Sequence, residues 1–148
     1  MASGAPMTSE VKDAERPIAA IERLLRATNQ HDLDALTACF AEDYENQTPA
    51  HPARAFHGRA QVRRNWEQIF AFVPDLRADI LRSAVDGTDV WTEWEMRGIR
   101  RDRTVHHLCG VVVFSVSNGV ISSARFYLEP VDTGDATVND ALRQQVVR

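Results

Sequence analysis

The sequence predicts an α+β domain in which N-terminal helices cover one face of a curved antiparallel sheet. The sheet is predicted from two hairpin turn signals in the second half of the chain, Asp86-Gly87 and Asn118-Gly119. Both central positions of the favoured two-residue turn need a positive φ, which Gly, Asn and Asp adopt at low cost. Strands joined in this way are antiparallel, so these segments form a meander. The expected strands are 76–85, 90–97, 105–116 and 120–129.

The composition is typical of one soluble globular domain. The chain has 148 residues, of which 44% are hydrophobic and 26% charged, and this length is enough to bury a core. The net charge of −4 argues against a nucleic-acid or anionic-membrane partner. No apolar run approaches the roughly 20 residues that span a bilayer, and residues 1–6 lack the features of a signal peptide. A cytoplasmic location is therefore expected, and Cys39 and Cys109 are expected to be buried free thiols.

The domain boundaries follow from where periodic patterns begin and end. Residues 1–12 are small and polar without periodicity, and are expected to form a disordered N-terminal tail. The folded domain is expected over residues 13–131. The remaining residues, 132–148, are expected to form a polar C-terminal tail that contains a short helix at 138–147.

Three helices are predicted in the first half of the chain. Pro17 suits the first turn of a helix, because the N–H groups of that turn have no partner, and apolar residues recur after it at helical spacing. Asp32 is a good N-cap for a second, shorter helix. Gly58 precedes a third helix, which Pro74 ends. The apolar stripe of the third helix comprises Val62, Trp66, Ile69 and Val73.

The strand 108–114 is expected to be covered on both sides. Its residues are apolar on both faces, whereas an antiparallel strand with one wet face would alternate. One cover is the helical layer. The second cover is either a second copy of the same sheet in a two-fold dimer or the C-terminal tail.

The segment 41–48 is predicted to be a short edge strand, since prolines follow it. Side chains alternate along a strand, so Tyr44 and Asn46 share one face. A phenol and an amide inside an apolar pocket are costly unless they pair with each other, with water or with a ligand. Tyr44 and Asn46 are therefore the leading candidates for functional residues, and a structural hydrogen-bond pair is the alternative.

Several short segments, together with the order of the elements, carry a resemblance to a known family. These segments are Arg-Ala-Thr-Asn-Gln-His-Asp-Leu-Asp-Ala-Leu at 26–36, Phe-His-Gly-Arg-Ala-Gln-Val-Arg at 56–63, Gly-Val-Val-Val-Phe at 110–114 and Arg-Phe-Tyr-Leu-Glu-Pro at 125–130. Over about residues 17–131 the chain resembles the SnoaL-like branch of the nuclear-transport-factor-2-like (NTF2-like) superfamily. The resemblance implies a cone-shaped sheet wrapped over helices, a deep pocket and frequent dimers. The superfamily includes polyketide cyclases, ketosteroid isomerases and epoxide hydrolases, so the fold does not give the function.

The resemblance also implies which faces look into the pocket. Epoxide hydrolases of the family use an Asp-Arg-Asp set, with Tyr and Asn holding the water. Tyr44 and Asn46 fall on the Tyr and Asn positions. The three charged positions fall on Trp94, Met96 and Phe126, which cannot transfer a proton, so epoxide hydrolysis is disfavoured. The residues expected to contact substrate are Trp66, Trp94, Met96, Phe126 and Leu128.

Cyclases and isomerases of the family are implied to use one carboxylate to remove a proton next to a carbonyl. The nearest acid here is Glu129, but its alternation is opposite to that of Phe126 and Leu128, so it is expected on the far side of the sheet. Histidine is the remaining acid–base group, because its free pKa of about 6.5 lies near working pH. Both faces of its strand are apolar, and His106 is preferred over His107 as the residue that faces the pocket.

No cofactor or metal site is predicted, because the chain has no His-Glu-x-x-His, no Cys-x-x-Cys and no glycine-rich phosphate loop. Two functions remain. The first is a small dimeric enzyme, an isomerase, cyclase or hydratase, that performs proton transfer on an apolar, oxygen-bearing small molecule. Its catalytic residues would be Tyr44, Asn46 and His106. The second is a non-catalytic ligand-binding or dimerisation module on the same fold, and an ionisable side chain on the inner face would distinguish the two.

Overall fold

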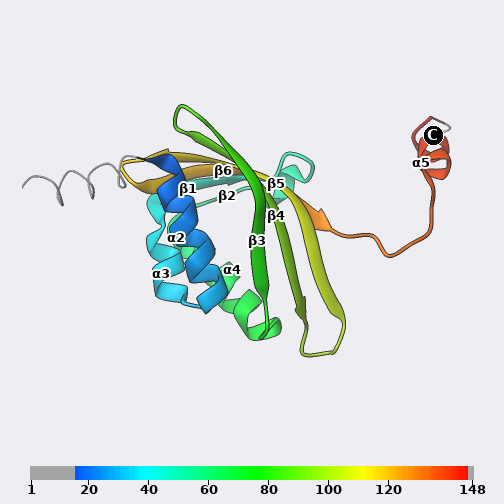
Figure 1. Cartoon of the computed structure of the whole chain (residues 1–148), viewed down its shortest axis with the longest axis horizontal. Coiled ribbons are helices and arrows are strands. Elements are labelled where there is room, and N and C mark those ends of the chain that lie inside the picture. Colours follow the sequence, from blue (N-terminus) through cyan, green and yellow to red (C-terminus); the bar gives the residue numbers. More distant parts are fainter. Residues whose placement is uncertain (1–15, 147–148) are drawn as a thin grey trace, which may run out of the picture.

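The computed structural model describes residues 16–146, so the tail expected at residues 1–12 lies outside the described residues. The elements in chain order are α2 (Pro17–Gln30), α3 (Leu33–Ala38), β1 (Phe40–Gln47), the 3-10 helix η1 (Pro52–Arg54), β2 (Phe56–His57), α4 (Arg59–Phe72), β3 (Arg77–Asp86), β4 (Asp89–Ile99), β5 (Val105–Ser117), β6 (Val120–Pro130) and α5 (Val138–Val146). The predicted α+β fold is confirmed: a curved, open sheet wraps over α2, α3 and α4 (Figure 1).

The sheet contains six strands in the order β2-β1-β6-β5-β4-β3. The strands β3 to β6 form the predicted antiparallel meander. The hairpin turns place Gly87, Asn118 and Gly119 at φ values of 61°, 54° and 79°, as their residue types predict. β1 differs from the expectation, because it runs parallel to β6 and carries β2 on its other side. The short β2 is therefore the edge strand, and the sheet is not antiparallel throughout.

Polar side chains attach the helices to the far edge of the sheet. The Asn29 amide at the end of α2 accepts a hydrogen bond from the Ala78 N–H at 2.7 Å and donates one to the Ala78 carbonyl at 2.9 Å. It thereby takes the place of a neighbouring strand for one residue of β3. Asp32 caps α3 as predicted, because its Oδ1 accepts a hydrogen bond from the Ala35 N–H at 3.0 Å. The helices are thus held across the hollow of the sheet.

The core fills the space between the helices and the inner face of the sheet. Its largest fully buried side chains include Trp94, Tyr44 and Phe114. The Trp94 indole N–H donates to the Thr92 hydroxyl at 2.6 Å, and that hydroxyl donates to the Val112 carbonyl at 2.7 Å. The polar atoms of this region are therefore paired, as burial requires.

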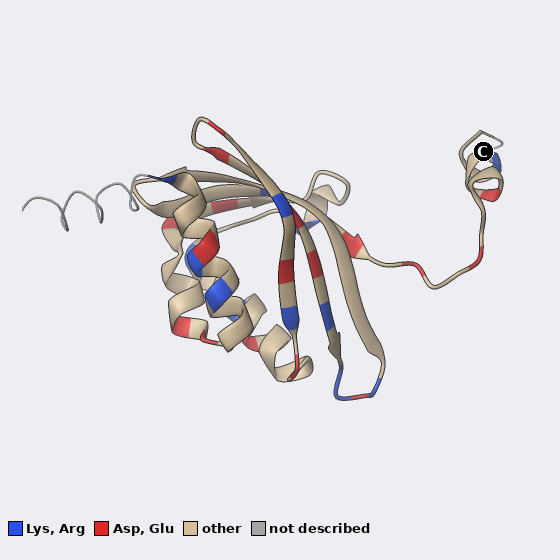
Figure 2. Ribbon diagram, in the orientation of Figure 1, with Lys and Arg blue, Asp and Glu red and all other residues tan. Residues whose placement is uncertain are grey.

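The outer face of the sheet carries charged pairs and exposed apolar side chains. Figure 2 shows acidic and basic residues along β3 and β4 and in the loop between β4 and β5. Trp91 and Tyr127 lie on this face and are 50% and 42% exposed. Both cysteines are free as expected, but Cys109 is exposed because its side chain points to this outer face, whereas Cys39 is buried.

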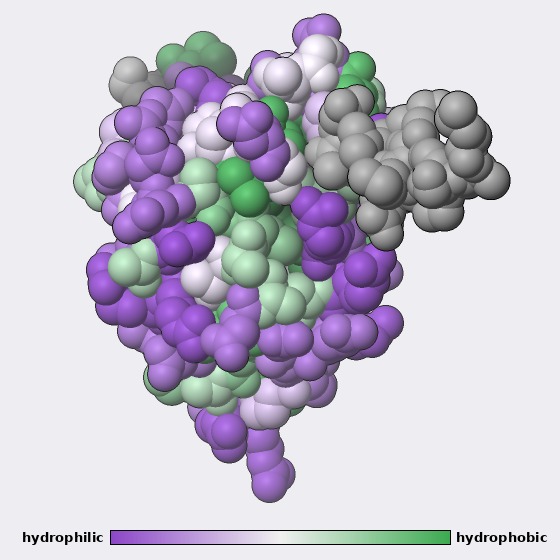
Figure 3. Space-filling model, turned by 90° about the vertical axis from the view of Figure 1, so that its left-hand side faces the viewer, coloured by the Kyte–Doolittle hydropathy of each residue, from purple (hydrophilic) through white to green (hydrophobic). Residues whose placement is uncertain are grey.

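The C-terminal segment does not cover the outer face. It leads away from the sheet to α5, in which no residue is buried (Figure 1). Figure 3 views the molecule from the side where α2 and α3 lie in Figure 1, and shows a central apolar patch framed by hydrophilic side chains. No helix within residues 16–146 has the length and apolar character needed to cross a membrane. The cytoplasmic location stays a prediction.

Gly110 generates the first testable prediction, because a side chain at this position of β5 would meet the backbone of β6. Its φ is +146°, and an added Cβ would run into the Tyr127 carbonyl oxygen. We expect Gly110→Ala to lower the free energy of unfolding by roughly 1–3 kcal/mol or more, measured by urea denaturation.

Gly87→Ala is the matched control, since Gly87 also has a positive φ but has open space around its Cβ position. We expect its cost to be limited to the backbone strain of about 1–2 kcal/mol. Equal losses in the two variants would show that the close approach at Gly110 does not contribute to stability.

Candidate functional site

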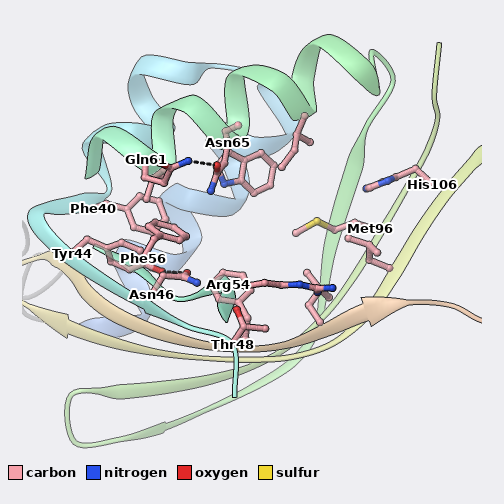
Figure 4. Close-up of a pocket in the computed structure, with 16 residues that line it drawn as sticks. Phe40, Tyr44, Asn46, Thr48, Arg54, Phe56, Gln61, Asn65, Met96 and His106 are labelled. Carbon is pink, nitrogen blue, oxygen red and sulfur yellow. Dashed lines mark hydrogen bonds between the residues drawn. The ribbon is translucent and has the colours of Figure 1, made fainter. Parts of the chain in front are cut away.

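A pocket of about 540 Å³ lies between α4 and the inner face of the sheet (Figure 4). This volume is within the range of small-molecule sites, about 300–1,000 Å³. The wall is mainly apolar, with a few amide, hydroxyl and charged groups. The apolar lining residues are Phe40, Phe56, Val62, Trp66, Ile69, Met96, Leu108, Phe126 and Leu128.

Tyr44 and Asn46 lie side by side on β1 at one end of the pocket. They are 1% and 8% exposed, and the Tyr44 hydroxyl donates to Asn46 Oδ1 at 2.7 Å. Burial raises the pKa of Tyr44 far above its usual value, so the phenol stays a neutral donor. With Oδ1 occupied by this bond, the Asn46 NH₂ group faces the pocket as a donor (Figure 4).

His106 lines the other end of the pocket, where β5 begins (Figure 4). Its Nδ1 is buried and has no hydrogen-bond partner within residues 16–146. Burial lowers the pKa of His106 below the usual value, and the positive charge of Arg100 lowers it further. His106 is therefore neutral at neutral pH. A buried nitrogen without a hydrogen-bond partner costs free energy, so a ligand or water that came to bind it would be stabilised.

The neighbouring His107 has a different environment on the outer face. Its Nε2 lies 2.9 Å from Glu95 Oε2, and Arg97 contacts the same oxygen at 2.8 Å. The hydrogen bond from His107 is the main cause that lowers the pKa of Glu95, so this carboxylate is ionised and paired. His107 thus faces away from the pocket, and alternation along β5 gives the two histidines opposite environments.

Glu129 also lies outside the pocket. Its Oε1 is 2.8 Å from His51 Nε2, and the glutamate side chain is 44% exposed. No Asp or Glu is found among the lining residues of the pocket in the described part of the chain. The acids of the later strands, Glu93, Glu95 and Glu129, occupy the outer face, as their alternation predicts.

Four of the five residues expected to contact substrate line the pocket: Trp66, Met96, Phe126 and Leu128. Trp94 does not. It is 2% exposed and bounds a small cavity of about 30 Å³ behind the pocket, which Trp66, Met96 and Phe126 separate from the main space. Trp94 is a core residue, and its indole N–H is paired with the Thr92 hydroxyl.

The structure adds polar lining residues that the sequence did not suggest. Gln61 and Asn65 lie one helical turn apart on α4, and the Gln61 amide donates to Asn65 Oδ1 at 2.8 Å (Figure 4). Arg54 reaches into the pocket from η1, next to Thr48. The i, i+4 spacing of the two amides beside the apolar stripe of α4 was an available signal. The position of Arg54 depends on a loop and had no such signal.

Within residues 16–146, no group of three or more His, Cys, Asp or Glu is positioned to bind a metal ion. The polar groups in the mainly apolar wall of the pocket are several hydrogen-bond donors, one neutral histidine and one arginine. Such a set can hold a polar substituent of an otherwise apolar molecule. It can also move a proton through the histidine ring.

The fold is similar to that of several solved structures. An LEH-like epoxide hydrolase from Mycobacterium tuberculosis has a TM-score of 0.68 at 21% identity, covering 89% of this chain and 96% of that chain. A second M. tuberculosis protein, in complex with estradiol-17beta-hemisuccinate, has a TM-score of 0.66 at 16% identity, covering 76% and 94%. A protein described as a SnoaL-like polyketide cyclase, from Shewanella denitrificans OS-217, has a TM-score of 0.64 at 11% identity, covering 76% and 90%.

These identities are low, so the similarities show the fold alone. Comparison with curated proteins finds no match. A family model described as a SnoaL-like domain matches residues 21–124, from the middle of α2 to β6, which is more than half of the chain. The protein, with its helices enclosed by a curved sheet, therefore belongs to the SnoaL-like domain family.

Proposed function

We propose that the protein binds an apolar, oxygen-bearing small molecule in this pocket and performs cofactor-free proton transfer on it, as an isomerase, cyclase or hydratase does. The observation that carries the proposal is that His106, held neutral by burial, lines a mainly apolar pocket whose opposite end carries the Asn46 donor. Structural neighbours with a steroid ester bound and with a polyketide cyclase description support this substrate class.

Tyr44 and Asn46 would hold the polar group of the substrate. The Asn46 NH₂ donates to a carbonyl or hydroxyl oxygen, while the Tyr44 hydroxyl keeps the amide in this orientation. A donor fixed before the reaction stabilises negative charge that develops on such an oxygen without the cost of reorientation.

His106 would act as the general base. The lone pair of the neutral ring takes a proton from the substrate, and the resulting imidazolium returns a proton at another atom of the same molecule. Asn46 and His106 lie at opposite ends of the pocket (Figure 4). The arrangement thus favours an elongated substrate that is anchored at the β1 end and reacts near His106.

A non-catalytic binding module on the same fold is the second candidate. It is favoured by the lack of any carboxylate among the lining residues within 16–146, since an acid is the usual group for proton abstraction next to a carbonyl. The two candidates share the ligand class and differ in the role of His106. Loss of turnover with retained binding in His106→Gln would support the enzyme, and a wild-type protein that binds but turns nothing over would support the module.

The role of Asn46 can be tested by ligand binding. We expect Asn46→Ala to weaken the binding of a steroid ketone up to about tenfold, since one hydrogen bond contributes roughly 0.5–1.5 kcal/mol. Tyr44→Phe should have a smaller effect, because it acts through the orientation of the amide. Titration with quenching of tryptophan fluorescence measures both, since Trp66 lines the pocket. Wild-type affinity in both variants would exclude this pair from the site.

The protonation of His106 can be measured without a substrate. We expect an NMR titration to give a midpoint below the free value of about 6.5, because burial and Arg100 both disfavour the charged ring. The neutral base is then present at pH 7, and activity should fall only as the pH drops through this lowered pKa.

Arg100→Gln should raise the titration midpoint of His106, because it removes the positive charge that lowers the pKa, while the larger effect of burial remains. Arg100→Lys, which keeps the charge, and Arg26→Gln, an exposed position on α2 that does not line the pocket, should leave the midpoint near the wild-type value. A wild-type midpoint above 6.5 would contradict the assignment of His106 as a neutral base.

We also propose that the protein is a homodimer that pairs the outer faces of two sheets. The outer-face patch, defined as Trp91, Cys109, Val111 and Tyr127, lies across β4, β5 and β6. Trp91 and Val111 border a groove of about 350 Å³, together with the Arg82–Glu93 ion pair. An apolar centre with charges of both signs at its rim suits an isologous two-fold interface.

Trp91→Glu should shift the protein from dimer to monomer in sedimentation equilibrium, because it places a charge within this patch. Val85→Glu is the control, since Val85 is equally exposed, at 50%, but lies outside the patch. A monomeric wild type, or equal effects of the two substitutions, would rule out this interface.

A further inference from the structure

We infer that the ligand carries a carboxylate and that Arg54 binds this group at the side of the pocket next to Thr48. The inference rests on the proposed function only in that a small molecule must occupy the pocket. Arg54 is the single Arg, Lys, Asp or Glu among the described residues that line it. Figure 4 shows its side chain extending into the cavity from the region of Asn46 and Thr48.

The guanidinium of Arg54 has no partner among the residues that the structure describes. No hydrogen bond or ion pair joins it to another residue within 16–146, whereas several other arginines of this part of the chain are paired: Arg63 with Asp34, Arg82 with Glu93 and Arg97 with Glu95. The nearby carboxylate of Glu129 is bound through its Oε1 to His51 and makes no ion pair with Arg54. Five donor N–H groups in a planar fork are thus left for a ligand, and this geometry matches a carboxylate.

The backbone that carries Arg54 is held in place. The Thr48 carbonyl accepts a hydrogen bond from the His51 N–H at 2.8 Å, and the His51 carbonyl accepts one from the Arg54 N–H at 2.9 Å. Pro52 fixes φ in the first position of η1. A cation on a loop with this much local bonding loses less conformational entropy when it binds than one on an open loop.

The rest of the pocket also favours an anion over a cation. The other polar groups that line the pocket are uncharged, and they include Asn46, Thr48, Gln61 and Asn65. Arg100 adds positive charge near His106, and its position is fixed by a hydrogen bond to the Val105 carbonyl at 2.6 Å. The acid closest in sequence to Arg100, Asp102, is engaged by the hydroxyl and the N–H of Thr104. An anionic ligand therefore meets Arg54 and no carboxylate among the described residues of the pocket wall, and the positive charge of Arg100 lies beyond the wall near His106.

The test compares a steroid carboxylic acid with the carboxamide of the same skeleton at pH 7. The two molecules differ in charge and scarcely in shape. For the wild type we expect the acid to bind about tenfold more tightly than the amide, and added salt should reduce this preference, because Arg54 is partly exposed to solvent. Isothermal titration calorimetry measures both affinities.

Arg54→Gln should abolish the preference for the acid, because it weakens the binding of the acid about tenfold and leaves the binding of the amide unchanged. Arg54→Lys should retain part of the preference. Arg26→Gln changes the net charge equally but lies on α2, away from the pocket lining, and should leave both affinities unchanged. Circular dichroism checks that each variant is folded, which is expected because Arg54 is exposed and makes no side-chain bond within residues 16–146.

The failure of this inference and the failure of the proposed function give different results. If acid and amide bind equally, in the wild type and in Arg54→Gln, the carboxylate site is overturned and the pocket remains a ligand site. If Arg54→Gln and Arg26→Gln weaken the binding of the acid equally, the cause is the net charge of the protein, and the carboxylate site is again overturned. If neither molecule binds, both proposals are overturned.

Discussion

The hydrogen-bonded register that joins β4, β5 and β6 decides which side chains face the helices. Met96 lies opposite Leu108, and Gly110 lies opposite Leu128. Because side chains alternate, a slip of one residue would turn these walls outward and would exchange His106 with His107. The close approach of Gly110 to the backbone of β6 belongs to the same constraint, since no larger residue fits that register without a shift. The chemistry of the pocket therefore depends on strand pairing before it depends on any single side chain.

The same alternation separates two kinds of electrostatic environment. On the outer face, carboxylates are paired with arginine or histidine: Glu93 with Arg82, Glu95 with His107 and Arg97, and Glu129 with His51. On the inner face, the polar groups are neutral or cationic, and the wall between them is apolar. A ligand that supplies hydrogen-bond acceptors complements the inner face, whereas a cationic ligand would find no acid there.

Burial gives the few polar groups of the pocket their properties. Tyr44 and Asn46 tolerate burial because they form a hydrogen bond with each other. This bond replaces part of the hydrogen bonding with water that both side chains lose on folding. His106 is different, since its Nδ1 is buried without a partner within residues 16–146 and its ring is held neutral. Fixed donors at one end and an unpaired nitrogen at the other give this member of a functionally diverse fold a specific chemistry to test.

The sequence by itself determined the main helices, the four-stranded meander and the faces of these strands. The turn signals Asp86-Gly87 and Asn118-Gly119 act locally, through the φ values that these residues adopt, and they define the meander. Side chains alternate between the two faces of a strand. This alternation placed Tyr44 and Asn46 on one face of β1, and it predicted that the glutamates of the later strands lie on the outer face of the sheet. Such features depend only on neighbours in the chain, so a single sequence contains them.

Tertiary structure alone decided the features that depend on distant segments. The parallel pairing of β1 with β6 joins strands about 80 residues apart, and no local signal encodes its direction. Arg54 lies on η1, in the loop between β1 and β2, and Trp94 is buried with its indole N–H bonded to Thr92. His106 was preferred to His107, but its environment is set by Arg100 and by the packing around it. Residues that meet through long-range packing thus define the site, while local periodicity defines only the faces that are available to it.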